Sequence, residues 1–161
     1  MKSLLIAAIV AYLMCRTSFA QEKPLSGSAQ TAKPTTEELE AKFKATMTKA
    51  VMSGRWFAIK DGALGEAKED KYSIVSAIKG EGDKWIISAR IRIKQQEIIA
   101  PIPVQVKWAG DTPVITLDDI GIPGGNNYSA RVLVYGQTYA NTWSGNDHAE
   151  LLNNIITNEK E

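Results

Sequence analysis

Hydrophobic and polar residues alternate with a period of two along most of the chain, which is the pattern of half-buried β-strands. The clearest example covers residues 85–94. Its two faces are apolar and polar in turn: Trp85, Ile87, Ala89, Ile91 and Ile93 against Ser88, Arg90, Arg92 and Lys94. Such alternation indicates one face in a core and the other in water. Similar or shorter apolar segments predict further strands at 56–60, 72–79, 102–108, 113–117, 128–135 and 138–143.

Short polar turns separate these segments, and several contain glycine, among them 80–83, 109–112 and 136–137. Turns of this length cannot hold a crossover helix, so sequential strands should pair antiparallel. A long meander removes its exposed edges by closing on itself. The pattern therefore predicts a mainly β fold, a small antiparallel up-and-down β-barrel of seven or eight strands with one N-terminal helix. A two-sheet β-sandwich is the alternative.

Three local features refine this pattern. Pro101 and Pro103 cannot donate hydrogen bonds to a neighbouring strand, so their strand should lie at an edge or a bulge. Strict alternation over 72–79 places four residues on one face: Tyr72, Ile74, Ser76 and Ile78. Segments 61–70 and 118–127 are rich in Gly, Asp or Asn and are predicted to be loops.

Before the predicted strands, apolar residues recur at every fourth position. Thr35 and Glu38 have the spacing of a capping box, which marks the start of a helix. The apolar residues that follow share one face: Leu39, Phe43, Met47 and Val51. This spacing predicts a helix over 36–51 that docks its apolar stripe on the domain.

The C-terminal segment 149–157 fits two structures. Asp147 followed by Glu150 could cap a helix, and the apolar residues that follow have helical spacing: Leu151, Leu152, Ile155 and Ile156. The same residues could close the sheet as an eighth strand, and periodicity alone does not separate the two in so short a run.

The first twenty residues have the order of a cleaved secretory signal peptide. Lys2 precedes an apolar run of 11 residues at 4–14, and small residues then lead into a polar segment. A bilayer-spanning helix needs about 20 residues, so this run addresses the protein without anchoring it. We expect cleavage after Ala20 and a periplasmic or extracellular location. Residues 21–35 would form a flexible linker and 36–161 a single β-rich domain.

The only cysteine, Cys15, lies inside this leader. An exported domain without cysteine favours a bacterial envelope protein over a eukaryotic secreted one. Alternatively, Cys15 could carry a lipid, although Met14 stands where lipoprotein processing prefers a small residue. Cleavage removes two positive charges, Lys2 and Arg16, and moves the formal net charge from +1 to −1. This near-neutral balance argues against a nucleic-acid partner, and no later segment is apolar enough for a transmembrane anchor.

Few residues have catalytic or metal-binding chemistry. His148 beside Asp147 could act as a base oriented by a carboxylate, but no nucleophile motif such as G-x-S-x-G accompanies the pair. A metal site would have to be built from carboxylates, and the best oxygen-rich position, Asp118-Asp119, fits a turn better. We expect no catalytic residues, no metal site and no cofactor.

Aromatic residues are the most suggestive candidates for a binding role, since they lie near strand ends or on regular apolar faces. Inside a barrel such rings either fill the core or line a ligand cavity. Filling is their ordinary role. The ligand-binding hypothesis assigns five of them to a site for a small apolar ligand: Trp56, Trp85, Trp108, Trp143 and Tyr139.

Gly54-Arg55-Trp56 directly follows the predicted helix and opens the first strand. A G-x-W at this place, followed by a meander, resembles the calycin group, which includes lipocalins and avidins. The resemblance implies a lipocalin-like barrel whose tryptophan plugs the closed end and whose open end holds a ligand or contacts a protein. By motif it covers residues 54–56 alone, because no Thr-Asp-Tyr triplet is present.

Segments 108–115 and 139–148 resemble uncharacterised exported bacterial β-rich proteins. In that group the second segment reads approximately Tyr-Ala-Gly-Thr-Trp, followed by a glycine-rich stretch with a histidine. This chain has Asn141 in place of the glycine. The resemblance implies export and a shared β fold, assigns no activity, and favours a strand for 149–157.

Three functional hypotheses follow. The first is an exported, non-enzymatic β-barrel module that binds a small apolar ligand or a protein partner. The alternative is a structural or interaction protein of the cell envelope with a filled barrel. A hydrolase that uses Asp147 and His148 has the least support.

Overall fold

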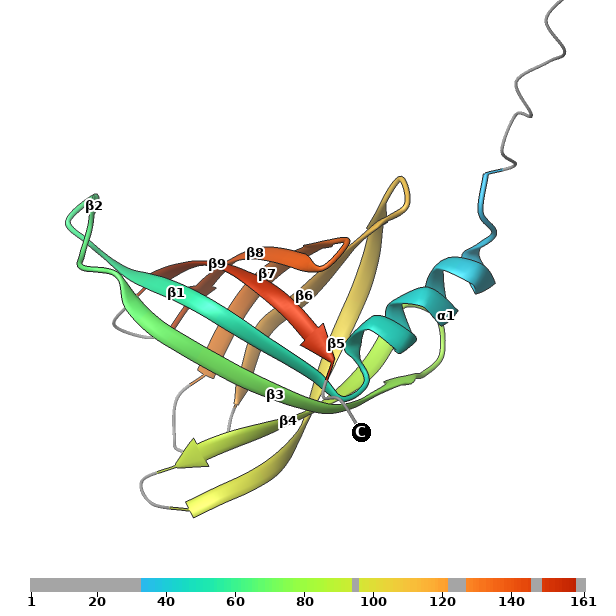
Figure 1. The fold of residues 1–161 in the computed structure, drawn as a ribbon, viewed down its shortest axis with the longest axis horizontal. Coiled ribbons are helices and arrows are strands. Elements are labelled where there is room, and N and C mark those ends of the chain that lie inside the picture. Colours follow the sequence, from blue (N-terminus) through green and yellow to red (C-terminus); the bar gives the residue numbers. More distant parts are fainter. Residues whose placement is uncertain (1–32, 94–95, 122–126, 146–148, 159–161) are drawn as a thin grey trace, which may run out of the picture. The chain divides into compact units, whose positions relative to one another are not determined.

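The computed structural model describes residues 33–93, 96–121, 127–145 and 149–158, which form a closed antiparallel β-barrel with one helix (Figure 1). The predicted leader and most of the predicted linker lie outside these residues. The elements are α1 Thr36–Met47, β1 Ala50–Lys60, β2 Ala63–Leu64, β3 Lys68–Lys79, β4 Lys84–Ile93, β5 Gln96–Ala109, β6 Thr112–Gly121, β7 Asn127–Tyr135, β8 Thr138–Ser144 and β9 Ala149–Asn158.

Sequential strands are neighbours, and the last pairs with the first. The β1–β9 ladder runs from Ala50 opposite Asn158 to Ile59 opposite Ala149. Among the described residues, β2 pairs only with the end of β1, so the other eight strands form the wall. The predicted small up-and-down barrel with one N-terminal helix is confirmed, and the two-sheet sandwich is not formed. The C-terminal segment is a strand, as the second resemblance favoured.

The helix begins where the sequence predicts and ends earlier. Thr35 and Glu38 form the capping box, with the Glu38 amide donating to Thr35 Oγ1 at 3.2 Å. The predicted end at residue 51 is wrong, because α1 ends at Met47 and Val51 belongs to β1. Thr48 has extended backbone angles and Lys49 a positive φ of 54°. This two-residue turn lets Ala50 start pairing with β3 and β9, which outweighs the helical spacing.

A bulge in β3 changes which residues face the core. The register shifts between Ile74 and Ser76, so Ala77 is 1% exposed while Ile78 is 54% exposed. The strict alternation that placed Ser76 and Ile78 on the same face as Ile74 is therefore wrong beyond Ile74. A bulge adds one residue to a strand and reverses the faces that follow. Here the carbonyl of Val75, inside the bulge, accepts from the Lys49 amide at 3.4 Å.

The predicted loop 118–127 also begins later than expected. β6 continues to Gly121 across a second irregularity between Leu117 and Ile120. Asp119 lies there with a positive φ of 54°, and its amide donates to Ser129 Oγ on β7 at 3.0 Å. In the loop predicted at 61–70, β2 and the start of β3 are strand.

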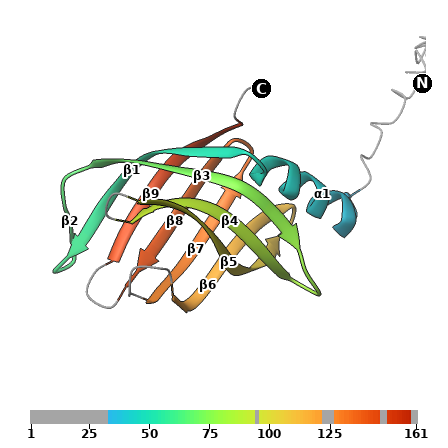
Figure 2. The same cartoon turned by 90° about the horizontal axis from the view of Figure 1, so that it is seen from below.

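One end of the barrel is covered by α1, and we call it the helix end (Figure 2). Phe43 and Met47 point into the core there, with 2% and 1% of their surfaces exposed. The Phe43 ring meets the ring of Trp85 edge-on, with centroids 4.9 Å apart. Glu40 adds an ion pair with Lys79 at 3.3 Å. Part of the apolar core thus lies beneath α1.

The first half of β5 pairs on one side only among the described residues. Gln96–Gln105 pairs with β4, whereas pairing with β6 starts at Gln105, and Figure 1 shows the β4–β5 hairpin running out beyond the neighbouring strands. The Val106 amide donates to Asp83 on the β4 side at 2.8 Å. Because alternate residues point their N–H groups in the same direction, the nitrogens of Pro101 and Pro103 face the unpaired side. The prediction that these prolines lie at an edge is confirmed.

Replacing both Pro101 and Pro103 with threonine should make the protein associate through this edge. The change supplies two N–H donors on a strand whose other side is already paired, which is the arrangement that leads to edge-to-edge pairing. We expect the sedimentation coefficient to rise with protein concentration. Ser88→Thr is the matched control, since Ser88 lies opposite Pro101 on a strand paired on both sides. A double variant that stays monomeric at all concentrations would show that the prolines do not protect this edge.

Candidate functional site

Polar residues interrupt the apolar interior on β3, β9 and β8, and Gly54 of β1 lies between the first two. One row of the register runs from Asp70 on β3 through Gly54 on β1 and Asn154 on β9 to Tyr139 on β8. These positions face inward, because the next residues along the same faces, such as Met52 and Ile156, are core residues with 6% and 2% exposure. The row therefore crosses the inside of the barrel wall.

We call the polar band the set of inward-facing polar and aromatic side chains in and beside this row. Tyr72 lies two residues beyond Asp70 on β3, while Asn141 and Trp143 follow Tyr139 on β8. The band comprises Asp70, Tyr72, Tyr139, Asn141, Trp143 and Asn154. Tyr139, Asn141 and Asn154 are 3%, 8% and 7% exposed. Such deep burial of amide groups is uncommon unless their hydrogen bonds are made.

Gly54 makes room for this band. A Cβ atom on Gly54 would lie 1.6 Å from Asn154 Oδ1 and 2.7 Å from the backbone oxygen of Asn153. The Asn154 amide thus occupies the space over Gly54, and its Nδ2 donates to Tyr139 Oη. On the other side of Gly54, the Tyr72 hydroxyl is hydrogen-bonded to Asp70. The glycine of the G-x-W motif is needed here for close packing with β9.

Four buried polar atoms of the band have no hydrogen-bond partner among the described residues. They are Asp70 Oδ2, Asn141 Oδ1, Asn154 Oδ1 and Trp143 Nε1. Leaving a buried polar atom unpaired costs about 1–3 kcal/mol. Buried groups of this kind are normally satisfied by bound water or by a ligand. The band therefore leaves three acceptor oxygens and one donor nitrogen without a hydrogen-bond partner.

The two tyrosines of the band, Tyr72 and Tyr139, have raised pKa values. Burial, followed by the hydrogen bond to Asp70, raises the pKa of Tyr72 above its ordinary value. Burial raises the pKa of Tyr139 to about 12, against a smaller lowering effect of the hydrogen bond from Asn154. Nearby negative charge contributes in the same direction, from Asp70 on both tyrosines and from Glu150 on Tyr72. Both hydroxyls are neutral hydrogen-bonding groups at physiological pH.

We expect alkaline pH to destabilise the fold through these two tyrosines. An unfolded tyrosine ionises near pH 10, whereas Tyr139 in the fold keeps its proton to about pH 12. Stability from this difference is complete below about pH 10 and is lost as the pH rises from there through the folded pKa. Phenolate absorbance should show a late-titrating component that Tyr139→Phe reduces and Tyr135→Phe, at an exposed position, leaves intact. If the late-titrating component is as large in Tyr139→Phe as in the parent protein, the raised pKa of Tyr139 is contradicted.

The structure divides the five aromatic residues proposed from the sequence. Trp85 and Trp108 belong to the helix end, where both rings contact Phe43. Tyr139 and Trp143 belong to the polar band, and Trp143 also meets Tyr128 edge-on. Trp56 lies one row from the band, opposite Lys68 and Leu152, with Lys68 Nζ 4.8 Å from its ring centroid. Of these five residues, Trp56, Tyr139 and Trp143 are therefore the ones near enough to contact a ligand at the polar band.

Sequence reasoning missed the polar members of the band. Asp70 fell in a predicted loop, and Asn154 fell in a segment that fitted either a helix or a strand. Asn141 carried a usable signal, because it stands between Tyr139 and Trp143 on a face that is otherwise apolar. A polar residue on an apolar strand face is a candidate for a buried hydrogen bond.

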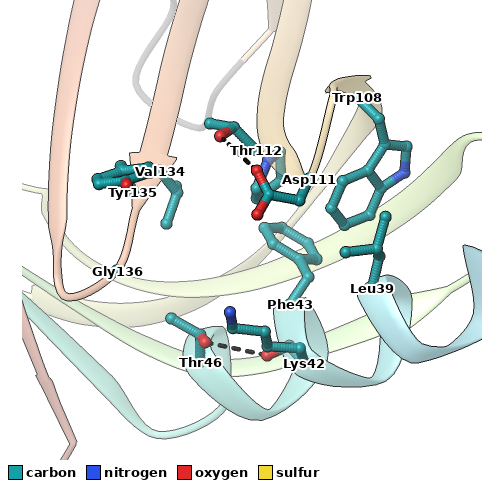
Figure 3. A pocket seen from close by; sticks show the side chains of 11 residues that line it. Leu39, Lys42, Phe43, Thr46, Trp108, Asp111, Thr112, Val134, Tyr135 and Gly136 are labelled. Atoms are coloured by element: carbon teal, nitrogen blue, oxygen red, sulfur yellow. Dashed lines mark hydrogen bonds between the residues drawn. The ribbon is translucent and has the colours of Figure 1, made fainter. Parts of the chain in front are cut away.

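A hollow lies between α1 and the turns at the helix end (Figure 3). It has a volume of about 300 Å³, and its walls include Leu39, Phe43, Trp108 and Tyr135. Lys42 and Asp111 lie on different sides of it, and Thr112 Oγ1 donates to Asp111 at 3.4 Å. Lys42 and Asp111 are exposed to solvent. Unlike the polar band, this hollow therefore has no buried polar atom without a hydrogen-bond partner among the described residues.

The remaining candidates from the sequence are Asp147, His148, Asp118 and Asp119. Asp147 and His148 lie outside the described residues. Asp118 pairs with Arg131 at 2.6 Å, and Asp119 accepts from Asn127 Nδ2 at 3.0 Å. Across the described ranges, no three His, Cys, Asp or Glu side chains gather as a metal site would require. The described residues also contain no helix with the length and hydrophobicity to cross a membrane.

Comparison with known protein families, curated proteins and solved structures identifies no relative of this chain. The chain matches no protein-family model, no curated protein and no solved structure.

Proposed function

We propose that the protein is a non-enzymatic binding module that holds a small, mainly apolar ligand inside the barrel, at the polar band. The observation that carries the proposal is the set of four buried, unpartnered polar atoms on an otherwise apolar interior. Small-molecule sites are mostly apolar, with a few polar groups that fix the orientation of the ligand. The band has this composition.

The loss of stability caused by the unpaired polar atoms of the band supports a binding role over a purely structural one. An interior that only stabilised the fold would be better filled by apolar side chains, because each unpaired buried polar atom lowers the stability by about 1–3 kcal/mol. The helix end shows such filling, with Phe43, Met47 and Trp85 at 2%, 1% and 2% exposure. Polar groups at this cost are typical of functional positions.

The proposed setting is outside the cytoplasm. The signal-peptide pattern of residues 1–20 and the resemblance to exported bacterial proteins support a periplasmic or extracellular location. The G-x-W resemblance to calycins supports ligand binding within a barrel. Detection of the N-terminus at Gln21 in protein from the culture medium or periplasm would test the location.

Native mass spectrometry tests the binding role. We expect protein expressed from the full chain to carry extra mass that disappears on denaturation. A matched variant is Asn141→Leu, which replaces a buried unpaired amide with an apolar group. It should lose the extra mass and raise the stability of the ligand-free protein by about 1 kcal/mol. The control Thr142→Leu changes the adjacent exposed position and should keep the ligand. Extra mass retained by Asn141→Leu, or no extra mass in any preparation, would count against the proposal.

The outer surface supports the second candidate, an interaction protein of the envelope. A hollow of about 570 Å³ lies over β1, β9, β8 and β7, with Ser53, Ala140 and Leu133 in its lining. Leu133 and Ile155 beside it are 43% and 54% exposed. Exposed apolar surface of this kind can mark a protein contact. A stable complex that Leu133→Lys abolishes, without loss of fold, would favour this candidate; a monomer that recovers no partner would not.

A further inference from the structure

We propose that the ligand of the polar band carries a positively charged amine, which is held by Asp70, Asn154 and Asn141. This inference rests on the proposed function, since it names the chemistry of the ligand at the same site. Its starting observation is the kind of atom left unpaired. Three of the four are acceptor oxygens, and one of these belongs to a carboxylate.

The protein uses its own donors elsewhere in the band. Asp70 Oδ1 accepts from the Lys71 amide at 2.8 Å, and the Asp70 carboxyl is also hydrogen-bonded to Tyr72. The donor end of the Asn154 amide bonds Tyr139. The acceptors left without a partner are Asp70 Oδ2 and the side-chain oxygens of Asn141 and Asn154. An ammonium group has three donors and no acceptor, and so complements this set.

Gly54 brings two of these oxygens toward each other. Asp70 and Asn154 stand on the two strands that flank β1, opposite Gly54 on either side. No side chain separates them, and Asn154 Oδ1 lies over Gly54, 1.6 Å from the position of a Cβ atom. Asn141 is on β8, one row beyond the Tyr139 that pairs with Asn154. The three oxygens therefore lie on one part of the inner wall.

The charge near the band has the sign that attracts a cation. Asp70 and Glu150 both act on the Tyr72 hydroxyl as negative charges. Lys68, two residues before Asp70 on the same strand, is exposed and lies over the Trp56 ring, 4.8 Å from its centroid. A carboxylate that receives a charged donor in a buried site makes a stronger hydrogen bond than a neutral pair would.

The aromatic residues near the band fit the rest of such a ligand. Trp56 and Trp143 lie one row and two rows from Asn154 toward the end opposite α1. Their rings offer apolar surface for the body of an amine, and the unpaired Trp143 Nε1 can donate to an acceptor on that body. The ligand class is thus an aromatic or aliphatic amine of small size.

The test compares three head groups on one apolar body: phenethylamine, phenethyl alcohol and phenylacetate. Isothermal titration calorimetry with the protein purified from expression of the full chain should show the amine binding at least about tenfold more tightly than the alcohol, with the carboxylate weakest. Asp70→Asn should lower the affinity for the amine by about tenfold or more and leave that for the alcohol nearly unchanged. Glu69→Gln is the control, because Glu69 is the next carboxylate along β3 and is exposed opposite Arg55.

The outcomes separate this inference from the proposed function. Alcohol or carboxylate binding as tightly as the amine would overturn the amine inference and leave the binding role intact. The same holds if none of the three binds while native mass spectrometry shows a bound neutral or acidic molecule. Absence of binding together with a ligand-free protein in every preparation would overturn both. If Asp70→Asn fails to fold, the ranking of the three head groups on the unmodified protein decides.

Discussion

Gly54→Ala is expected to destabilise the protein by about 3 kcal/mol, at the upper end of what overpacking normally costs. The added methyl group would lie 1.6 Å from Asn154 Oδ1 and 2.7 Å from the backbone oxygen of Asn153. Rotation of Asn154 could relieve the first clash, but only a shift of β9 relative to β1 could relieve the second. Chemical denaturation with circular dichroism as the readout measures the loss.

Two further variants identify the cause. Gly65→Ala should be close to neutral, because its nearest neighbour would be the Ala58 oxygen at 3.5 Å, an ordinary contact. The pair Gly54→Ala with Asn154→Ala should recover only part of the stability, since the backbone clash stays. Full recovery in this double variant, or a Gly54→Ala protein as stable as the parent, would show that β1 and β9 are not held together as closely as described.

Phe43→Ala should cost about 3–5 kcal/mol, the range for removing a large aromatic side chain from a core. Phe43 is 2% exposed and its ring lies edge-on to both Trp85 and Trp108, with centroids 4.9 and 6.4 Å away. The variant would leave a cavity beneath α1 and remove the aromatic contacts that Phe43 makes with Trp85 and Trp108. Unfolding followed by tryptophan fluorescence would report both the stability and the change around these rings.

Leu39→Ala is the control for this prediction. Leu39 lies one helical turn before Phe43 and is only half-buried at the edge of the hollow in Figure 3. We expect it to cost clearly less than Phe43→Ala. Equal losses for the two variants would mean that α1 is held by its whole apolar stripe and not mainly by the buried end with Phe43 and Met47.

The local parts of the fold could be predicted from the sequence because they depend on near neighbours. The capping box at Thr35 and the strand at 85–91 follow from spacing alone. The edge position of Pro101 and Pro103 follows from the donor that proline lacks. In each case the residues that decide the structure are a few positions apart.

The parts that could not be predicted depend on pairing between distant strands. The bulge after Ile74 changes which residues of β3 face the core, and no residue type at that position indicates a bulge. The helix ends at Met47 because Ala50 and the residues after it pair with β3 and β9. The polar band requires the register of β3, β1, β9 and β8, which brings Asp70 and Asn154 to either side of Gly54. A single sequence contains no direct record of that register.

The most direct test of a ligand site at the polar band is a high-resolution crystal structure of the protein isolated without denaturation. The account predicts continuous electron density, larger than a water molecule, within hydrogen-bond distance of Asp70 Oδ2 and of the oxygens of Asn141 and Asn154. Isolated water-sized peaks at these three atoms, or side chains that pair with each other and leave no space, would contradict it.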